Sequence, residues 1–100
     1  MSKQFKIDGQ GKYALVTGAA GGIGRPLTQR LLDRGFHVLM LDISEQGLEA
    51  AAKSMRGGAT TQLACDLTDA ASVRSIFEQV RTITPNLQVV VNNAGLIKPG

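Results

Sequence analysis

Glycines occupy four of the seven positions from residue 18 to residue 24, directly after the apolar run Ala14-Leu15-Val16. Glycine admits positive φ and lets a flat dianionic group approach the main chain with no Cβ in the way. A helix that opens near Gly22-Ile23 would direct free N–H groups and the positive end of its dipole at that group. A tight turn between a strand and a helix would need only one or two glycines. We therefore expect a phosphate-binding loop that includes Gly18, Gly21, Gly22 and Gly24.

The loop departs from two stricter phosphate motifs. Ile23 stands where the P-loop pattern G-x-x-x-x-G-K-[ST] has its second glycine, and the loop contains no lysine. Leu27 stands where the third glycine of G-x-G-x-x-G would be. The pattern present is T-G-x-x-x-G-x-G from Thr17 to Gly24, with a wider first gap.

Asp42 is a second candidate binding residue, because it ends the next apolar run after the loop. Dinucleotide-binding folds carry an acid at that place for the adenosine ribose. Its carboxylate accepts hydrogen bonds from both ribose hydroxyls and would repel a 2′-phosphate. By itself an aspartate after a strand is usually a turn former. Together with the loop it favours NAD over NADP.

The elements that must position these residues alternate between strand and helix patterns. Apolar runs predict strands over residues 13–16, 36–41, 61–65 and 87–91. Between them, helices are expected from Ile23 to a stop at Gly35, from a Ser44 cap to Gly57-Gly58, and after a cap at Thr68 or Asp69. The last helix should bury the stripe Val73, Ile76, Phe77 and Val80. This alternation predicts one α/β domain over residues 1–100, a Rossmann-like doubly wound parallel sheet with strand order 3-2-1-4, of which only the N-terminal half is present.

Composition excludes several classes of function. The 100 residues are 43% hydrophobic and 19% charged with a net charge of +3, and the charges are scattered, so no nucleic-acid footprint is expected. No run approaches a membrane span, and the N-terminus lacks the apolar core of a signal peptide. The single cysteine, Cys65, indicates simple packing and a reducing, cytoplasmic location. No metal site is predicted.

Two motifs and two acids, each at its own predicted strand end, carry a family resemblance. The motifs are Thr17-Gly18-Ala19-Ala20-Gly21-Gly22-Ile23-Gly24 and Asn92-Asn93-Ala94-Gly95, and the acids are Asp42 and Asp66. With them, residues 9–97 resemble the cofactor-binding N-terminal half of a short-chain dehydrogenase/reductase of the "classical" type. The resemblance implies hydride transfer between a nicotinamide and a carbonyl or secondary alcohol. It also implies a homo-oligomer as the full-length enzyme.

The resemblance assigns roles residue by residue. Asp42 would hold the ribose hydroxyls with Ile43 against the adenine, while Asp66 would accept from the adenine amino group and Leu67 would cover the ring. Asn92 would tie neighbouring strands together. NADP-preferring members often carry a basic residue where this chain has Gly21 or Ile43, which favours NAD again, although Arg25 could reach a phosphate. The complete set of expected cofactor-binding residues is Gly18, Ala20, Gly21, Gly22, Ile23, Gly24, Asp42, Ile43, Asp66, Leu67, Asn93, Ala94 and Gly95.

The family's catalytic Tyr-x-x-x-Lys pair and serine are the main departure, because they would lie beyond Gly100. Tyr13 begins a strand on the opposite edge, and His37 is expected to be structural, so no catalytic residue is assigned. We therefore expect a partial chain or truncated product. Val89-Val90-Val91 would then form an exposed apolar strand, and the isolated chain should aggregate, dimerise or be only marginally stable.

Two other functions compete with a dehydrogenase or reductase. A non-catalytic NAD-binding sensor or scaffold would keep the loop without the chemistry. A methyltransferase that binds S-adenosylmethionine also has a glycine loop and an acid after its second strand, but it gives no reason for Asn92-Asn93-Ala94-Gly95. These residues indicate neither the substrate nor the direction of the reaction.

Overall fold

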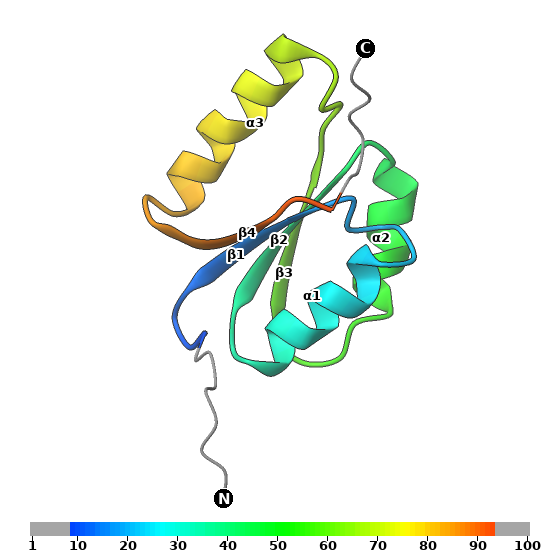
Figure 1. Cartoon of the computed structure of the whole chain (residues 1–100), viewed down its shortest axis with the longest axis vertical. Coiled ribbons are helices and arrows are strands. Elements are labelled where there is room, and N and C mark those ends of the chain that lie inside the picture. The colour runs from blue at the N-terminus through cyan, green and yellow to red at the C-terminus, as the bar shows by residue number, and fades with distance from the viewer. Residues whose placement is uncertain (1–8, 94–100) are drawn as a thin grey trace, which may run out of the picture.

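A parallel sheet with helices on both faces forms the body of the protein (Figure 1). The structure is a computed structural model that describes residues 9–93. Its elements, in chain order, are β1 (Tyr13–Thr17), α1 (Gly24–Asp33), β2 (His37–Asp42), α2 (Glu45–Lys53), β3 (Ala59–Ala64), α3 (Ala70–Ile83) and β4 (Leu87–Val91).

The strand order is β3-β2-β1-β4, and every pairing is parallel. β1 pairs with β2 from Tyr13↔His37 to Thr17↔Leu41, and β2 pairs with β3 from His37↔Ala59 to Asp42↔Ala64. Parallel neighbours need crossover connections, and here each crossover contains one helix. The Rossmann-like α/β fold and the order 3-2-1-4 expected from the sequence are confirmed.

Two apolar layers enclose the sheet, because β1 and β2 are apolar on both of their faces. One layer joins the sheet to α1 and α2, and its buried members are Ala14, Val16, Ala19, Leu32, Phe36, Val38, Met40, Leu48 and Ala51. The other lies beneath α3 and contains Leu15, Leu39, Leu41, Leu63, Cys65, Ile76 and Val80. Figure 1 shows α3 standing apart from α1 and α2 across the sheet. Residues that alternate along each strand therefore enter different layers.

The predicted element ends are right to within two residues except at α2, which ends at Lys53 and not beside Gly57-Gly58, and there are three further corrections. α1 begins at Gly24, so Gly22 and Ile23 lie before the helix. β3 begins at Ala59 and ends before Cys65. Phe77, expected in the buried stripe of α3, is 43% exposed, whereas Val73, Ile76 and Val80 of the same stripe pack into the core beneath the helix.

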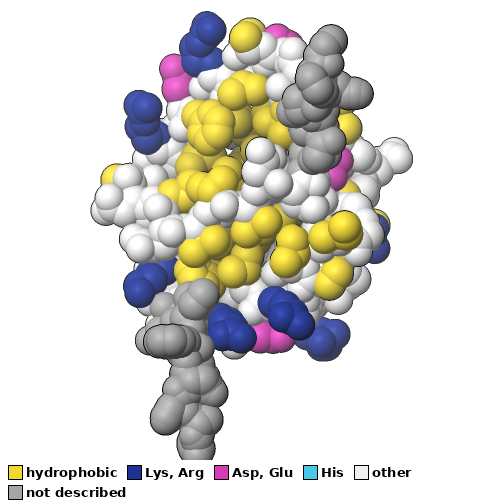
Figure 2. All heavy atoms as spheres, in the orientation of Figure 1, with side chains coloured by type: hydrophobic (Ala, Val, Ile, Leu, Met, Phe, Trp, Pro, Cys, Tyr) yellow, Lys and Arg dark blue, Asp and Glu magenta, His cyan; other side chains and the backbone are white. Residues whose placement is uncertain are grey.

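β4 lies at an edge of the described sheet and is less covered than the central strands. Its side chains alternate between half-buried and exposed, and Val90 is 59% exposed. Figure 2 shows apolar side chains that reach the surface over the middle of the face seen in Figure 1. The exposed apolar strand expected from Val89-Val90-Val91 is present in the described residues, and the consequence for association stays a prediction.

Candidate functional site

The carboxyl ends of all four strands meet at one edge of the sheet. The glycine loop follows β1, Asp42 ends β2, Asp66 comes two residues after β3, and Asn93 comes two residues after β4. Open parallel sheets bind ligands beyond this edge, near the point where strand order reverses. In this sheet that point lies between β1 and β4, beside the glycine loop.

The four loop glycines divide into two that the fold requires and two that it does not. Gly18 has φ +65, and a Cβ on Gly24 would lie 2.7 Å from Ala19 Cα and overlap the Gly18 carbonyl oxygen. Gly21 and Gly22 have no positive φ and are exposed, and a Cβ on Gly22 would meet nothing within 4 Å. The packing of the chain therefore gives no reason for glycine at residues 21 and 22, where the backbone is exposed.

The N-terminus of α1 differs from the other helix starts in the described part of the chain. Ser44 caps α2 by accepting from Gly47 N–H, and Asp69 caps α3 by accepting from Ala71 N–H. Ile23 at the α1 N-cap supplies no side-chain hydrogen bond, and the first turn holds no acid. The dipole of α1 thus meets the loop without a protein anion or cap, which suits a phosphate group.

The Asp42 carboxylate is fixed against the glycine loop. Its Oδ2 accepts from Ala20 N–H at 3.1 Å, and its Oδ1 accepts from Ser44 N–H at 3.2 Å. One bond comes from the loop and the other from the start of α2. Each carboxylate oxygen keeps a further lone pair for a ligand hydroxyl.

Thr17, Asn92 and Asn93 tie the end of β1 to the end of β4. The Thr17 hydroxyl lies 3.1 Å from Asn92 Oδ1, to which it can donate, and it accepts from Asn93 N–H at 2.8 Å. Asn93 Nδ2 also donates to the Gly18 carbonyl at 3.4 Å. Asn92 thus joins neighbouring strands as the resemblance implied, and Asn93 borders the loop.

The Asp66 carboxylate accepts two hydrogen bonds from its own turn. The Thr68 hydroxyl and the Thr68 N–H donate to Asp66 Oδ1 at 2.6 and 3.0 Å, and these bonds lower the pKa of the carboxyl below its usual value. The backbone N–H of Asp66 donates to Ser72 Oγ at 3.1 Å, which fixes the turn against α3. An ionised carboxylate in this position can accept a hydrogen bond from an amino group.

Two adjoining hollows occupy this edge, and Gly18 and Asp42 line both. One holds about 250 Å³ and is lined by Gly18, Asp42, Ile43, Cys65, Asp66, Leu67 and Thr68. The other holds about 280 Å³ and is lined by Gly18, Gly21, Gly22, Ile23, Asp42 and Asn93. Five large apolar side chains are exposed in the described residues, and three of them border these hollows: Ile23, Ile43 and Leu67. Ile43 and Leu67 line the first hollow, which therefore suits a flat apolar ring. The second hollow is lined by the glycine backbone next to the uncapped start of α1, which suits an anion.

Nine of the thirteen expected residues line the two hollows. Ala20 and Gly24 do not, because Ala20 bonds to Asp42 from the loop and Gly24 packs beneath Gly18. Ala94 and Gly95 lie outside the described residues. Cys65 and Thr68 also line the first hollow, and neither is among the residues expected to bind the cofactor. Their place follows from the turn at Asp66, which no residue-type pattern signals.

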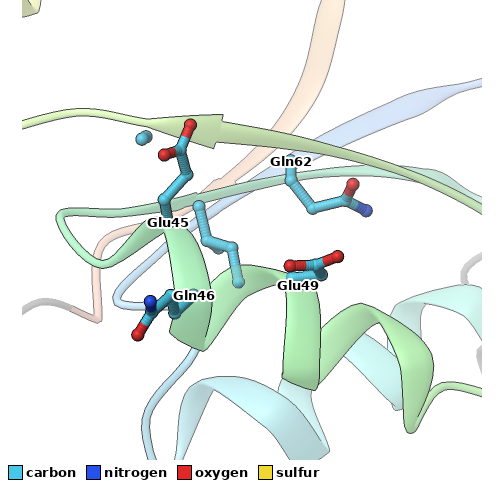
Figure 3. A pocket seen from close by; sticks show the side chains of 6 residues that line it. Glu45, Gln46, Glu49 and Gln62 are labelled. Carbon is cyan, nitrogen blue, oxygen red and sulfur yellow. The ribbon is translucent and has the colours of Figure 1, made fainter.

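A third hollow, of about 380 Å³, lies between α2 and β3 (Figure 3). Glu45, Glu49 and Gln62 are among the residues that line it. The two carboxylates make it unfavourable for a phosphate, and it lies away from the glycine loop.

Tyr13 and His37 lie at the opposite edge, as expected. Their rings stack with centroids 4.7 Å apart, and His37 Nε2 lies 2.8 Å from Thr61 Oγ1. Partial burial lowers the pKa of His37. In residues 9–93 no three His, Cys, Asp or Glu side chains are grouped to hold a metal, and no helix there could cross a bilayer.

The family model described as short chain dehydrogenase matches residues 12–100. The chain belongs to this family. It is 38% identical over 96 residues to D-threitol dehydrogenase of Mycolicibacterium smegmatis, covering 94% of this chain and 36% of that protein.

Solved structures of the short-chain dehydrogenase family agree with the fold. The crystal structure of NAD+-bound xylitol dehydrogenase matches with TM-score 0.81 and 34% identity, over 87% of this chain and 34% of that one. A metagenomic short-chain oxidoreductase in complex with NADP matches with TM-score 0.83 and 30% identity, over 88% of this chain and 41% of that one. The chain thus spans about a third of the length of D-threitol dehydrogenase and xylitol dehydrogenase.

Proposed function

We propose that this chain binds NAD at the edge formed by the glycine loop, Asp42 and Asp66. In a complete enzyme it would serve hydride transfer between the nicotinamide and the carbonyl or secondary alcohol carbon of a small molecule. The observation that carries the proposal is the bare, exposed backbone of Gly21 and Gly22 between an uncapped helix start and a fixed carboxylate. The named relatives support a nicotinamide dinucleotide of either kind at this edge, since one was solved with NAD+ and another with NADP.

The sub-sites follow from the chemistry around each hollow. The pyrophosphate would lie against residues 18–23 in the second hollow, where backbone N–H groups and the α1 dipole favour an anion. The ribose would lie at Asp42, which borders both hollows, and the adenine would lie between Ile43 and Leu67 with its amino group near Asp66. Ala94 and Gly95, by family resemblance, would continue the surface beneath the cofactor.

The preference for NAD over NADP rests on Asp42. Its carboxylate is fixed by two backbone N–H groups, so it cannot swing away from a 2′-phosphate without losing both bonds. At about 4 Å, two like charges repel by about 1–4 kcal/mol between bulk water and a protein surface. We expect NAD to bind roughly 5- to 900-fold more tightly than NADP.

A non-catalytic NAD-binding sensor or scaffold is the alternative, and it would use the same hollows. The membership of the chain in the short-chain dehydrogenase family favours the enzyme. The homo-oligomeric state and the cytoplasmic location expected from the sequence remain predictions.

Calorimetric titration of the chain with NAD, NADP and S-adenosylmethionine tests the proposal. We expect saturable binding of NAD, weaker binding of NADP and none of the methyl donor. Asp42→Asn keeps the side-chain shape, removes the charge and replaces one of the two accepting oxygens by an NH2 donor, so it should narrow the gap between NAD and NADP. Asp33→Asn on the exposed end of α1 serves as the charge-matched control. Binding of the methyl donor alone would overturn the proposal.

A further inference from the structure

Arg25 has an unexpected charge for its position, because it is the second residue of α1. A cation in the first helical turn opposes the helix dipole, where an acid is normally favoured. α2 follows the usual pattern with Glu45 in its first turn. The unfavourable placement of Arg25 therefore calls for a compensating interaction.

The compensating interaction is with the glycine loop. Arg25 Nε donates to the Ala20 carbonyl oxygen at 3.0 Å, and Arg25 N–H donates to the Gly21 carbonyl oxygen at 3.1 Å. On its other side, Ala20 donates its N–H to Asp42 Oδ2 at 3.1 Å. Ala20 is thus held at its carbonyl by a side chain from α1 and at its N–H by a side chain from β2.

The packing around Ala20 adds a third constraint. A Cβ on Gly47 of α2 would lie 3.1 Å from Ala20 Cβ, so the helix approaches the loop closely at that point. Three elements therefore contact this one loop residue. Beside it, Gly21 is held only through its backbone, because its N–H donates to the Gly18 carbonyl at 3.1 Å and its carbonyl accepts from Arg25 N–H at 3.1 Å, and a Cβ on Gly22 would meet nothing within 4 Å. The shape of the exposed part of the loop depends on how Ala20 is held.

We propose that Arg25 is a positioning residue for the dinucleotide loop, and that it acts through its Nε hydrogen bond to Ala20 rather than through its charge. Together with Asp42 it fixes the Ala20 unit, so that the backbone of residues 21 and 22 presents a preformed surface to the pyrophosphate. Asp42 then has two connected tasks, since it contacts the ribose and also anchors the loop. This inference rests on the proposed function of the site.

Two variants separate the hydrogen bond from the charge. In Arg25→Gln, the side-chain Nε2 stands as many bonds from Cα as Arg Nε does, so the donor remains and the charge is lost. Arg25→Met keeps a similar length but removes the donor. In calorimetry, the Kd of Arg25→Gln for NAD should lie within about threefold of the wild-type Kd. The Kd of Arg25→Met should be about 3- to 10-fold higher than that of Arg25→Gln, which is the range expected for one hydrogen bond. Adenosine, which lacks the pyrophosphate, should bind all three proteins equally.

Three results would overturn the proposal. If Arg25 binds the phosphate by charge, both variants lose affinity for NAD to the same extent, and the proposal is overturned. It is also overturned if neither variant loses affinity, or if adenosine weakens in parallel with NAD.

A measurement without nucleotide keeps this test apart from that of the proposed function. NMR order parameters for residues 20–22 should fall in Arg25→Met and stay at the wild-type value in Arg25→Gln. If the wild type binds no dinucleotide, the proposed function fails, while the order parameters still report whether Arg25 holds the loop. Unchanged order parameters in Arg25→Met would refute the positioning role.

Discussion

Gly22→Ala should leave the fold intact and still impair dinucleotide binding. A Cβ at this position meets nothing within 4 Å of the protein, and Gly22 has no positive φ. Replacing such a glycine by alanine restricts the unfolded chain and stabilises the folded one by about 0.4–1 kcal/mol. For a domain of about 100 residues, this corresponds to a rise in Tm of roughly 2–8 °C.

The binding loss follows from the distance at which a phosphate must lie. Charge-assisted N–H···O bonds are about 2.7–2.9 Å long, so an added methyl group on the open backbone pushes the phosphate away from at least one N–H group. Loss of one hydrogen bond to a charged group removes about 1.5–3 kcal/mol, which raises Kd by roughly 10- to 150-fold.

The assay combines thermal unfolding with calorimetric titration of NAD. Gly24→Ala is the matched comparison, because its Cβ would lie 2.7 Å from Ala19 Cα and 2.9 Å from the Gly18 carbonyl carbon. We expect that variant to lose about 1–3 kcal/mol of stability through overpacking. The reasoning is refuted if Gly22→Ala binds NAD like the wild type, or if it unfolds at a lower temperature.

Three further variants test other parts of the structure. Thr28 is fully buried and its hydroxyl has no partner in the described residues, so Thr28→Val should raise the free energy of unfolding in urea by about 1 kcal/mol, and no gain over Thr28→Ser would contradict this. Burial lowers the folded-state pKa of His37 below 6.5, so its neutral form favours folding fully above pH 6.5 and this contribution is lost as the pH falls towards the lowered value. His37→Gln should therefore lose less stability between pH 7.5 and pH 5 than the wild type, and parallel losses would count against the assignment. Val90→Lys places a charge on an exposed edge strand and should reduce self-association in analytical ultracentrifugation, whereas an unchanged sedimentation profile would show that β4 is not the contact.

Most strands of the sheet can be predicted from the sequence because they are short apolar runs. The apolar runs 36–41 and 87–91 each follow the end of a helix. Gly35, which was expected to end the first helix, has φ +97 just after α1. β3 was harder, since Ala59 and Thr60 carry no apolar pattern. They become strand residues by pairing with His37 and Val38, which a local pattern does not show.

The site was predictable as a set of residue types but not as an arrangement. Glycine spacing and the acid at Asp42 follow from local patterns, and both lie at the expected edge. The bond from Ala20 to Asp42 joins positions brought together by the β1–β2 pairing, and the bond from Arg25 to Ala20 depends on where α1 begins. Periodicity also placed Phe77 on the inner stripe of α3, but a period alone does not show which residues of a stripe the sheet covers, and Phe77 stays 43% exposed.

The most direct test of the central claim is a map of amide chemical shifts on addition of NAD to the whole chain. We predict saturable changes at Gly21, Gly22 and Ile23 and at Asp66 and Leu67, with Glu45, Glu49 and Gln62 beside the third hollow unchanged. Changes confined to that third hollow, or no changes at the loop at saturating NAD, would contradict the account.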